Sequence, residues 1–155
     1  MNRNIKIIAA ITLSATVAFV AWIGAGTETA TAAPIVEVYK SPTCGCCKDW
    51  VTHMRENGFE VNVHNTNDVA PIKKEAGVPQ RLSSCHTAMV DGYVIEGHVP
   101  ADDVKRMLTE RPAILGISAP GMPVGSPGME MGDRKDPYSV VTFDNDGKVT
   151  LFSRH

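Results

Sequence analysis

The sequence predicts a mixed α/β protein with one folded domain, and three observations support this prediction. Short runs rich in β-branched and aromatic residues, typical of strands, alternate with runs whose apolar residues recur at helical spacing. An Asp91-Gly92 pair separates two of the strand-like runs, as in a two-residue hairpin. The chain of 155 residues is 43% hydrophobic, which is enough for one packed core. Its formal net charge of −2 gives no electrostatic basis for binding nucleic acid.

Residues 1–32 are expected to lie outside this domain as a signal peptide. Two basic residues precede an uncharged apolar run over 7–26, and small residues follow it, which is the layout of an export signal. Ala30 and Ala32 occupy the small-residue positions of a cleavage site, so the folded domain covers 33–155. Because the apolar run has about the length that spans a bilayer, an uncleaved membrane anchor is the alternative. Both interpretations place the domain outside the cytoplasm.

The core elements are expected between residues 35 and 110. In chain order they are a strand over 35–39, a helix over 48–57, a strand over 59–64, a short helix over 68–75, hairpin strands over 87–90 and 93–96, and a helix over 100–110. Trp50, Val51 and Met54 lie on one face of the first helix. Gly58 and Pro112 are placed to end the first and last helices. The order β-α-β-α-β-β-α contains a parallel pair, a hairpin and flanking helices, and it indicates a thioredoxin-like fold.

The residues after this core are expected to add two features. Residues 113–137 are rich in glycine and proline and contain three methionines, so they predict an irregular loop that is a candidate lid. Residues 138–152 predict a C-terminal β-hairpin with its turn over 144–147. Both features are assigned to the same domain as the core.

Four cysteines are the first indication of function. Cys44, Cys46 and Cys47 follow the first expected strand and lead into the first helix, where free backbone amides and the helix dipole stabilise thiolates. Cys85 comes just before the first hairpin strand, which should run antiparallel to the first strand. Its beginning then lies at the same sheet edge as the cysteine-rich turn, so we expect all four sulfurs to lie within reach of one another.

These sulfurs allow two kinds of thiol chemistry. An even number of cysteines in an exported protein favours disulfides. The least strained pairing joins Cys44 to Cys47 and Cys46 to Cys85. The run from Cys44 to Cys47 also has the C-x-x-C spacing of a thiol-disulfide oxidoreductase. In that interpretation Cys46 competes in thiol exchange, unless Cys85 resolves the mixed disulfide.

A soft-metal site explains the number of thiols more directly. Cu(I) accepts sulfur ligands, and closely spaced thiolates can bridge several ions. Zinc is the alternative metal, because four thiolates make a closed tetrahedral structural site. Three sulfur donors in one short loop favour Cu(I) over zinc. We therefore expect Cu(I) bound by the four cysteines.

Several motifs carry a resemblance to a known family. They are Thr43-Cys44-Gly45-Cys46-Cys47, Cys85-His86, Asp91-Gly92-Tyr93, Gly121-Met122-Pro123 and Gly128-Met129-Glu130. In this combination the chain resembles the exported copper-resistance CopG family of small C-x-C-C metal-binding proteins, over nearly the whole of 33–155.

This resemblance implies a thioredoxin-like domain that binds copper through Cys44, Cys46, Cys47 and Cys85, with one or several ions in the cluster. It also implies a role in periplasmic copper resistance, together with other periplasmic copper-handling proteins. Interconversion of Cu(I) and Cu(II) is a further implication, and turnover of that reaction would make the protein a copper oxidoreductase.

Two histidines and one methionine are additional candidate ligands. His86 can bind the same metal as Cys85 if both precede the strand, whereas within a regular strand it turns away. His98 follows the second hairpin strand and should reach the same edge, and its alternative is a solvated loop histidine. Met122 is a candidate thioether ligand. With the other methionines of its loop it predicts a cover or transfer surface, and flexible packing is the alternative role.

Overall fold

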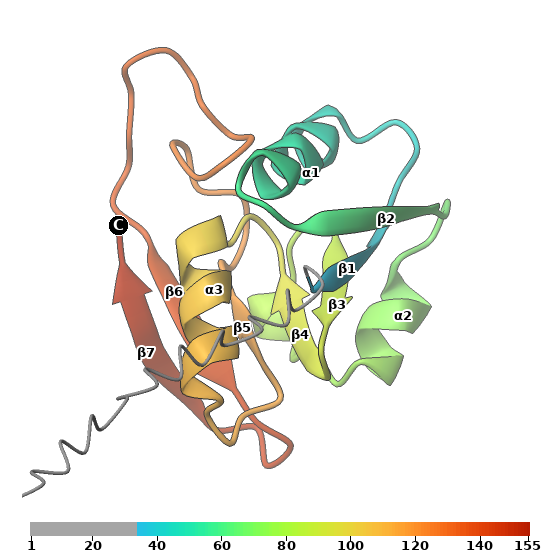
Figure 1. The fold of residues 1–155 in the computed structure, drawn as a ribbon, viewed down its shortest axis with the longest axis vertical. Coiled ribbons are helices and arrows are strands. Elements are labelled where there is room, and N and C mark those ends of the chain that lie inside the picture. Colours follow the sequence, from blue (N-terminus) through green and yellow to red (C-terminus); the bar gives the residue numbers. More distant parts are fainter. Residues whose placement is uncertain (1–33) are drawn as a thin grey trace, which may run out of the picture. The chain divides into compact units, whose positions relative to one another are not determined.

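Seven β-strands form a single mixed sheet in the computed structural model, which describes residues 34–155 (Figure 1). In chain order the strands are β1 (Ile35–Lys40), β2 (Glu60–Asn65), β3 (Thr87–Val90), β4 (Tyr93–Glu96), β5 (Gly116–Ser118), β6 (Ser139–Phe143) and β7 (Val149–Arg154). Their order across the sheet is β2-β1-β3-β4-β5-β6-β7. The leader predicted over 1–32 lies outside the described residues.

Three α-helices and a short 3-10 helix connect these strands. They are α1 (Gly45–Glu56), α2 (Ala70–Glu75), the 3-10 helix η1 (Gln80–Leu82) and α3 (Ala101–Glu110). Within residues 34–155, none of these helices has both the length and the apolar character needed to cross a membrane. The predicted mixed α/β fold is confirmed.

Strand β5 is an element that the sequence does not predict. It lies inside 113–137, where an irregular loop is expected, and it pairs parallel to β4 and antiparallel to β6. Three residues are too few to display the alternation of a strand, and the surrounding glycines and prolines indicate a loop. Hydrogen-bonding partners on both sides form this strand, which connects the β6–β7 hairpin to the main sheet.

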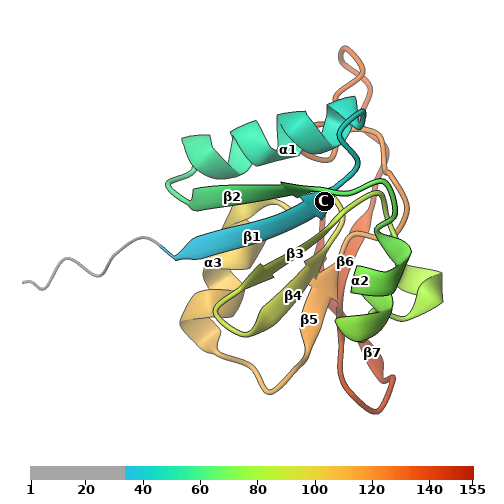
Figure 2. The ribbon, with the colours of Figure 1, turned by 90° about the vertical axis from the view of Figure 1, so that its right-hand side faces the viewer.

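Two hydrophobic clusters lie on opposite faces of the sheet. The larger cluster contains Trp50 and Met54 from α1 and Val104 from α3. In β4, Ile95 belongs to this cluster, whereas its neighbour Val94 belongs to the smaller cluster beside the segment after α2. Because neighbouring strand residues point to opposite faces, α1 and α3 cover one face and the segment after α2 packs on the other. Figure 2 shows α1 lying along β1 and β2.

Strand register brings three separate segments to one edge of the sheet. Tyr39 of β1 lies opposite Thr87 of β3, and Thr87 lies opposite Glu96 of β4. The turn after β1, the residues before β3 and the residues after β4 therefore lie side by side. At the other end of the β3–β4 hairpin, Asp91 and Gly92 have φ values of 49° and 85°, as the predicted two-residue turn requires.

Candidate metal centre

The first part of the site is the start of α1. The helix begins at Gly45 with Cys44 as its N-cap, three residues earlier than the predicted start at 48, so Cys46 and Cys47 occupy its first turn. The Cys47 N–H donates to the Cys44 Sγ at 3.4 Å. Unpaired amides and the positive end of the helix dipole lie at this position, and both stabilise anionic sulfur.

Cys85 approaches this turn from the segment before β3. Its Sγ lies 3.4 Å from the Cys47 Sγ, and the Cys44 and Cys46 Sγ atoms are 3.5 Å apart. The four sulfurs lie within 4.8 Å of one another. The structure thus brings together all four cysteines, as expected from the antiparallel pairing of β1 with β3.

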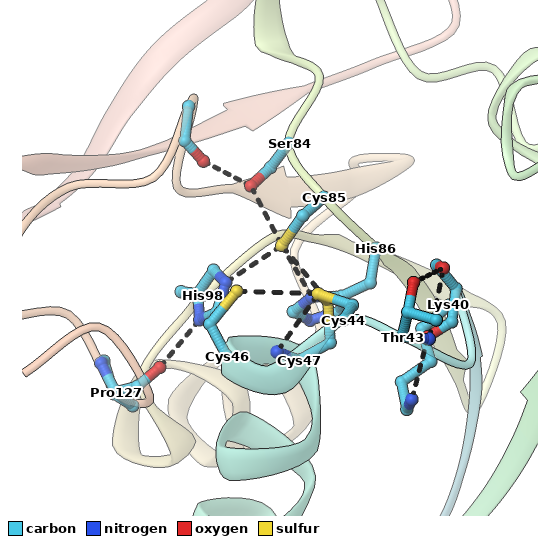
Figure 3. Close-up of a disulfide and its surroundings, with 12 residues drawn as sticks. Lys40, Thr43, Cys44, Cys46, Cys47, Ser84, Cys85, His86, His98 and Pro127 are labelled. Carbon is cyan, nitrogen blue, oxygen red and sulfur yellow. Dashed lines mark hydrogen bonds between the residues drawn. A yellow bond between two sulfur atoms is a disulfide. The ribbon is translucent and has the colours of Figure 1, made fainter.

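A disulfide joins two of these cysteines. Cys44 is bonded to Cys47, while Cys46 and Cys85 are free thiols (Figure 3). One bridge of the least strained predicted pairing is therefore present and the other is not. Burial, followed by the effect of neighbouring Cys46, raises the pKa of the Cys85 thiol to about 11, so this thiol is protonated at neutral pH.

His98 makes the shortest non-covalent contact to a sulfur atom in this site. Its Nε2 is 2.9 Å from the Cys85 Sγ, and its Nδ1 donates to the Pro127 carbonyl at 2.8 Å. Because a carbonyl can only accept, this contact places the proton of the neutral ring on Nδ1 and leaves the Nε2 lone pair facing sulfur. His98 is fully buried, which excludes the alternative of a solvated loop histidine.

His86 lies on the other side of Cys85. Both residues precede β3, and the His86 Nδ1 is 3.4 Å from the Cys85 Sγ. The ring is fully buried between the rings of Trp50 and His98, with centroids 4.4 and 5.0 Å away. Its Nε2 has no hydrogen-bond partner among the described residues, an unusual state for a buried polar atom.

Burial keeps both imidazoles neutral. It lowers the pKa of His98, and it lowers the pKa of His86 well below the ordinary value, with further contributions from His98 and from Lys73 and Lys40. Neutral imidazole is the form that binds a metal. Cys85, His86 and His98 form a second group whose ligand atoms lie within 4.8 Å of one another, and this group shares Cys85 with the cysteine cluster.

The predicted loop partly covers this site. Pro127 contacts His98, and a Cβ on Gly128 would lie 2.6 Å from the Cys46 carbonyl oxygen, so the loop backbone lies against the start of α1. Met122 is 55% exposed, and its neighbour Gly121 accepts a hydrogen bond from the Ser84 hydroxyl. The backbone next to Met122 therefore contacts the segment that carries Cys85, but the Met122 side chain itself faces solvent.

The remaining histidines have partners elsewhere in the structure. His53 accepts from the Ala101 N–H at the start of α3, and His64 is paired with Glu37. His155 contacts Asp103. The metal-ligating candidates are therefore the four cysteines with His86 and His98. The burial of His98 could not be predicted from the sequence, because it depends on the loop that packs over this residue.

The fold and the site together define a small mixed α/β protein with a sulfur-rich cluster at one sheet edge, able to hold a soft metal. Family comparison matches residues 82–129, which include Cys85, His86 and His98, to a family described as "Protein of unknown function, DUF411". Comparison with curated proteins finds no match.

Two solved structures are similar over the whole described domain. They are titled "Copper resistance protein copG", Form 2 and Form 1, and are 45% and 46% identical to this chain, with TM-scores of 0.76 and 0.74. The alignments cover 79% and 78% of this chain and 98% and 96% of the solved chains. The chain belongs to the CopG family of copper resistance proteins.

Proposed function

We propose that this protein is an exported copper-binding protein of copper resistance that holds Cu(I) in the cysteine cluster. The observation that carries this proposal is the convergence of four sulfurs and two buried, neutral imidazoles in two overlapping groups. Thiolates select Cu(I), and imidazole is a suitable additional ligand for copper. The names of the two similar structures support copper over zinc as the bound metal.

The overlap of the two groups supports binding of more than one ion. Cys85 belongs to both groups, and its sulfur lies 3.4 Å from the Cys47 sulfur and 2.9 and 3.4 Å from the ring nitrogens of His98 and His86. A thiolate has enough lone pairs to bridge two copper ions. Copper bound by both groups would have Cys85 as their shared ligand, with His86 and His98 as the nitrogen donors of the second group.

The disulfide supports a link between copper binding and redox state. While Cys44 and Cys47 are joined, two free thiols remain, and a dithiol reductant must deliver two electrons and two protons to restore all four. In the opposite direction, reduced Cys44 and Cys47 form the disulfide by giving one electron to each of two Cu(II) ions. This exchange yields two Cu(I) ions and releases the thiol protons. It is the redox conversion that we propose for this site.

We place this activity outside the cytoplasm, with the predicted leader over 1–32 as the export signal or anchor. Met122 and Met131 are 55% and 61% exposed and carry soft thioether sulfurs on the loop that packs against α1. We propose that this part of the loop passes copper to or from other periplasmic copper-handling proteins.

The test is copper loading of the anaerobically reduced protein, followed by metal analysis and thiol titration. We expect more than one equivalent of Cu(I) for the protein, a lower copper content for Cys46→Ser, and the loss of two thiols when two equivalents of Cu(II) are added instead. His64→Ala is the control, because this exposed histidine pairs with Glu37 away from the cluster. Retention of zinc in preference to copper would contradict the proposal.

A second candidate function is a thiol-disulfide oxidoreductase that uses Cys44 and Cys47. The disulfide at the start of α1, with C-x-x-C spacing, is the observation that favours it. In this case the metal-free protein, with Cys44 and Cys47 first reduced, would give two electrons and two protons to a disulfide substrate and re-form its own Cys44–Cys47 disulfide, and Cys46→Ser would leave that activity unchanged. The same variant therefore separates the two functions.

A further inference from the structure

Glu96, at the end of β4, is a fully buried carboxylate beside the metal centre. Its Oε1 accepts hydrogen bonds from the Ser84 N–H and the Lys73 ammonium group, both at 2.5 Å. Its Oε2 accepts from the Thr87 hydroxyl at 2.7 Å. Three donors therefore surround this one carboxylate, one from α2 and two from the stretch that contains Cys85 and His86.

These contacts hold both ends of the Cys85-His86 pair. Ser84 immediately precedes Cys85, and Thr87 immediately follows His86, so the carboxylate fixes the backbone on one side and a side chain on the other. The Ser84 hydroxyl also donates to the Gly121 carbonyl and lies 4.0 Å from the Cys85 Sγ. Movement of Glu96 would change the direction from which the Cys85 sulfur enters the cluster.

Lys73 supplies the charge that makes this arrangement stable. Its side chain reaches from α2 and is 11% exposed, and its ammonium group donates to both Glu96 and the Thr87 hydroxyl. A buried carboxylate without a cation and hydrogen-bond donors is strongly unfavourable. The ion pair thus connects α2 to the Cys85 segment, although α2 contributes no candidate ligand.

A glutamine at position 96 cannot reproduce these contacts. If the amide NH2 of glutamine took the place of Oε1, it would face two donors, the Ser84 N–H and the Lys73 ammonium group. If it took the place of Oε2, it could donate to the Thr87 hydroxyl, but this would reverse that bond and leave the Thr87 proton without its acceptor. In both orientations the side chain keeps its size and loses the charge that pairs with Lys73. Glu96→Gln is therefore a probe of positioning with little change in volume.

We propose that Glu96, paired with Lys73, is a positioning residue that holds Cys85 and His86 in the geometry needed for copper. The expected effect on copper binding rests on the proposed function, whereas the positioning role itself rests on the hydrogen bonds of Glu96. Partners that orient metal ligands are worth about tenfold to a hundredfold in metal affinity. The expected loss for Glu96→Gln lies in this range.

The test compares Glu96→Gln with Asp103→Asn. Asp103 is a matched control because it is also a buried carboxylate, which accepts from the Ser153 hydroxyl at 2.5 Å and lies 3.5 Å from the Arg106 guanidinium group, but it belongs to α3. Cu(I) affinity is measured by competition with a colorimetric chelator, and thermal unfolding is followed in parallel. We expect weaker copper binding by Glu96→Gln alone. Unchanged affinity in Glu96→Gln, or equal losses in both variants, would overturn the inference.

A second readout does not depend on copper. In the metal-free protein we expect iodoacetamide to modify Cys85 faster in Glu96→Gln than in Asp103→Asn or the unchanged chain, because the Cys85 segment loses its anchor. If the unchanged chain binds no copper, the proposed function fails while this rate still decides the positioning role. Equal rates in all three proteins would then overturn the inference as well.

Thr87→Val provides the same test if Glu96→Gln does not fold. This variant keeps the shape of a buried side chain and removes only the hydroxyl that donates to Glu96 and accepts from Lys73. We expect a smaller loss of copper affinity in the same direction. A folded Thr87→Val protein with unchanged affinity and an unchanged Cys85 modification rate would count against the proposal.

Discussion

At the residue scale, the state of each donor depends on one specific neighbour. The Pro127 carbonyl accepts a hydrogen bond from the Nδ1–H of His98, and this leaves the Nε2 lone pair facing Cys85. Burial keeps His86 neutral, although its Nε2 has no partner among the described residues. A metal ion that binds in this cluster would therefore meet imidazoles that are already neutral, whereas the free thiols must lose protons to bind it.

Cys85 provides a prediction about pH. Burial raises its pKa to about 11 in the metal-free folded protein, so its thiolate fraction and its rate of modification by iodoacetamide should rise about tenfold per pH unit between about pH 7 and about pH 10. Peptide mapping by mass spectrometry measures this rate at Cys85 itself. The urea-unfolded chain is the control, because its cysteines should reach half-maximal rates near pH 8.5, at about the ordinary thiol pKa.

The direction of the same shift also predicts an effect on stability. The unfolded thiol ionises at lower pH than the folded one, so ionisation favours unfolding as the pH rises from about 8.5 towards about 11. The urea midpoint should fall over this interval. A modification rate at Cys85 that levels off near pH 8.5 in the folded protein would contradict both statements.

At the element scale, the start of α1 and the loop that covers it act together. The helix begins inside the cysteine motif, so two cysteines point out of its first turn at fixed spacing. Gly128 allows the loop backbone to lie against this turn. It has a φ of +82°, and a Cβ would lie 2.6 Å from the Cys46 carbonyl oxygen and 2.7 Å from the Trp50 nitrogen. Only glycine fits such a close contact between two backbones.

Gly128→Ala is therefore expected to lift the loop from α1. The added methyl group meets backbone atoms that cannot move aside, and we expect a loss of about 1–3 kcal/mol in stability. Hydrogen exchange measured by mass spectrometry should become faster over 119–137. Gly132→Ala is the control, because Gly132 has a φ of +59° but a Cβ there would meet nothing within 4 Å. Equal exchange in the two variants would show that the loop does not depend on this contact.

At the scale of the whole molecule, the sheet determines where the site forms. β1, β3 and β4 are neighbours, and the antiparallel pairing of β3 with both others places the residues before β3 beside the turn after β1 and the residues after β4. The sulfur atoms of Cys47 and Cys85, which are 38 residues apart in the sequence, thereby lie 3.4 Å from each other. The same sheet continues through β5 to the C-terminal hairpin, and the hydrophobic clusters on its two faces stabilise this arrangement.

The centre of the sheet provides a prediction about stability. A Cβ on Gly116 of β5 would lie 2.1 Å from the Val94 carbonyl oxygen of β4 and 2.8 Å from the Phe143 ring, so Gly116→Ala should separate β5 from β4. We expect an unfolding free energy that is lower by at least about 1–3 kcal/mol, measured as a shift of the urea midpoint. Gly45→Ala is the control, since a Cβ there meets nothing within 4 Å. A Gly116→Ala midpoint equal to that of the control would contradict the close packing of these strands.

Much of this fold and site could be predicted because its signals are local. The Asp91-Gly92 turn and its flanking strands, the amphipathic pattern of α1 and the clustered cysteines can each be recognised within a few residues. Strand β5 could not be predicted, because its three residues become a strand only through their partners β4 and β6.

The sequence alone determined the order of helices and strands over 35–110, the three donors of the cysteine turn and, through the direction of the hairpin, the return of Cys85. The tertiary structure decided the position and tautomer of His98, the burial of His86 with its Nε2 unpaired among the described residues, and the anchoring of the Cys85 segment by Glu96. It also decided that Met122 is exposed. The physical reason is that the spacing of cysteines along the chain is enough to show which of them lie in the same turn. Burial and hydrogen-bond partners instead come from segments far apart in sequence, and these meet only when the sheet and its covering loop have formed.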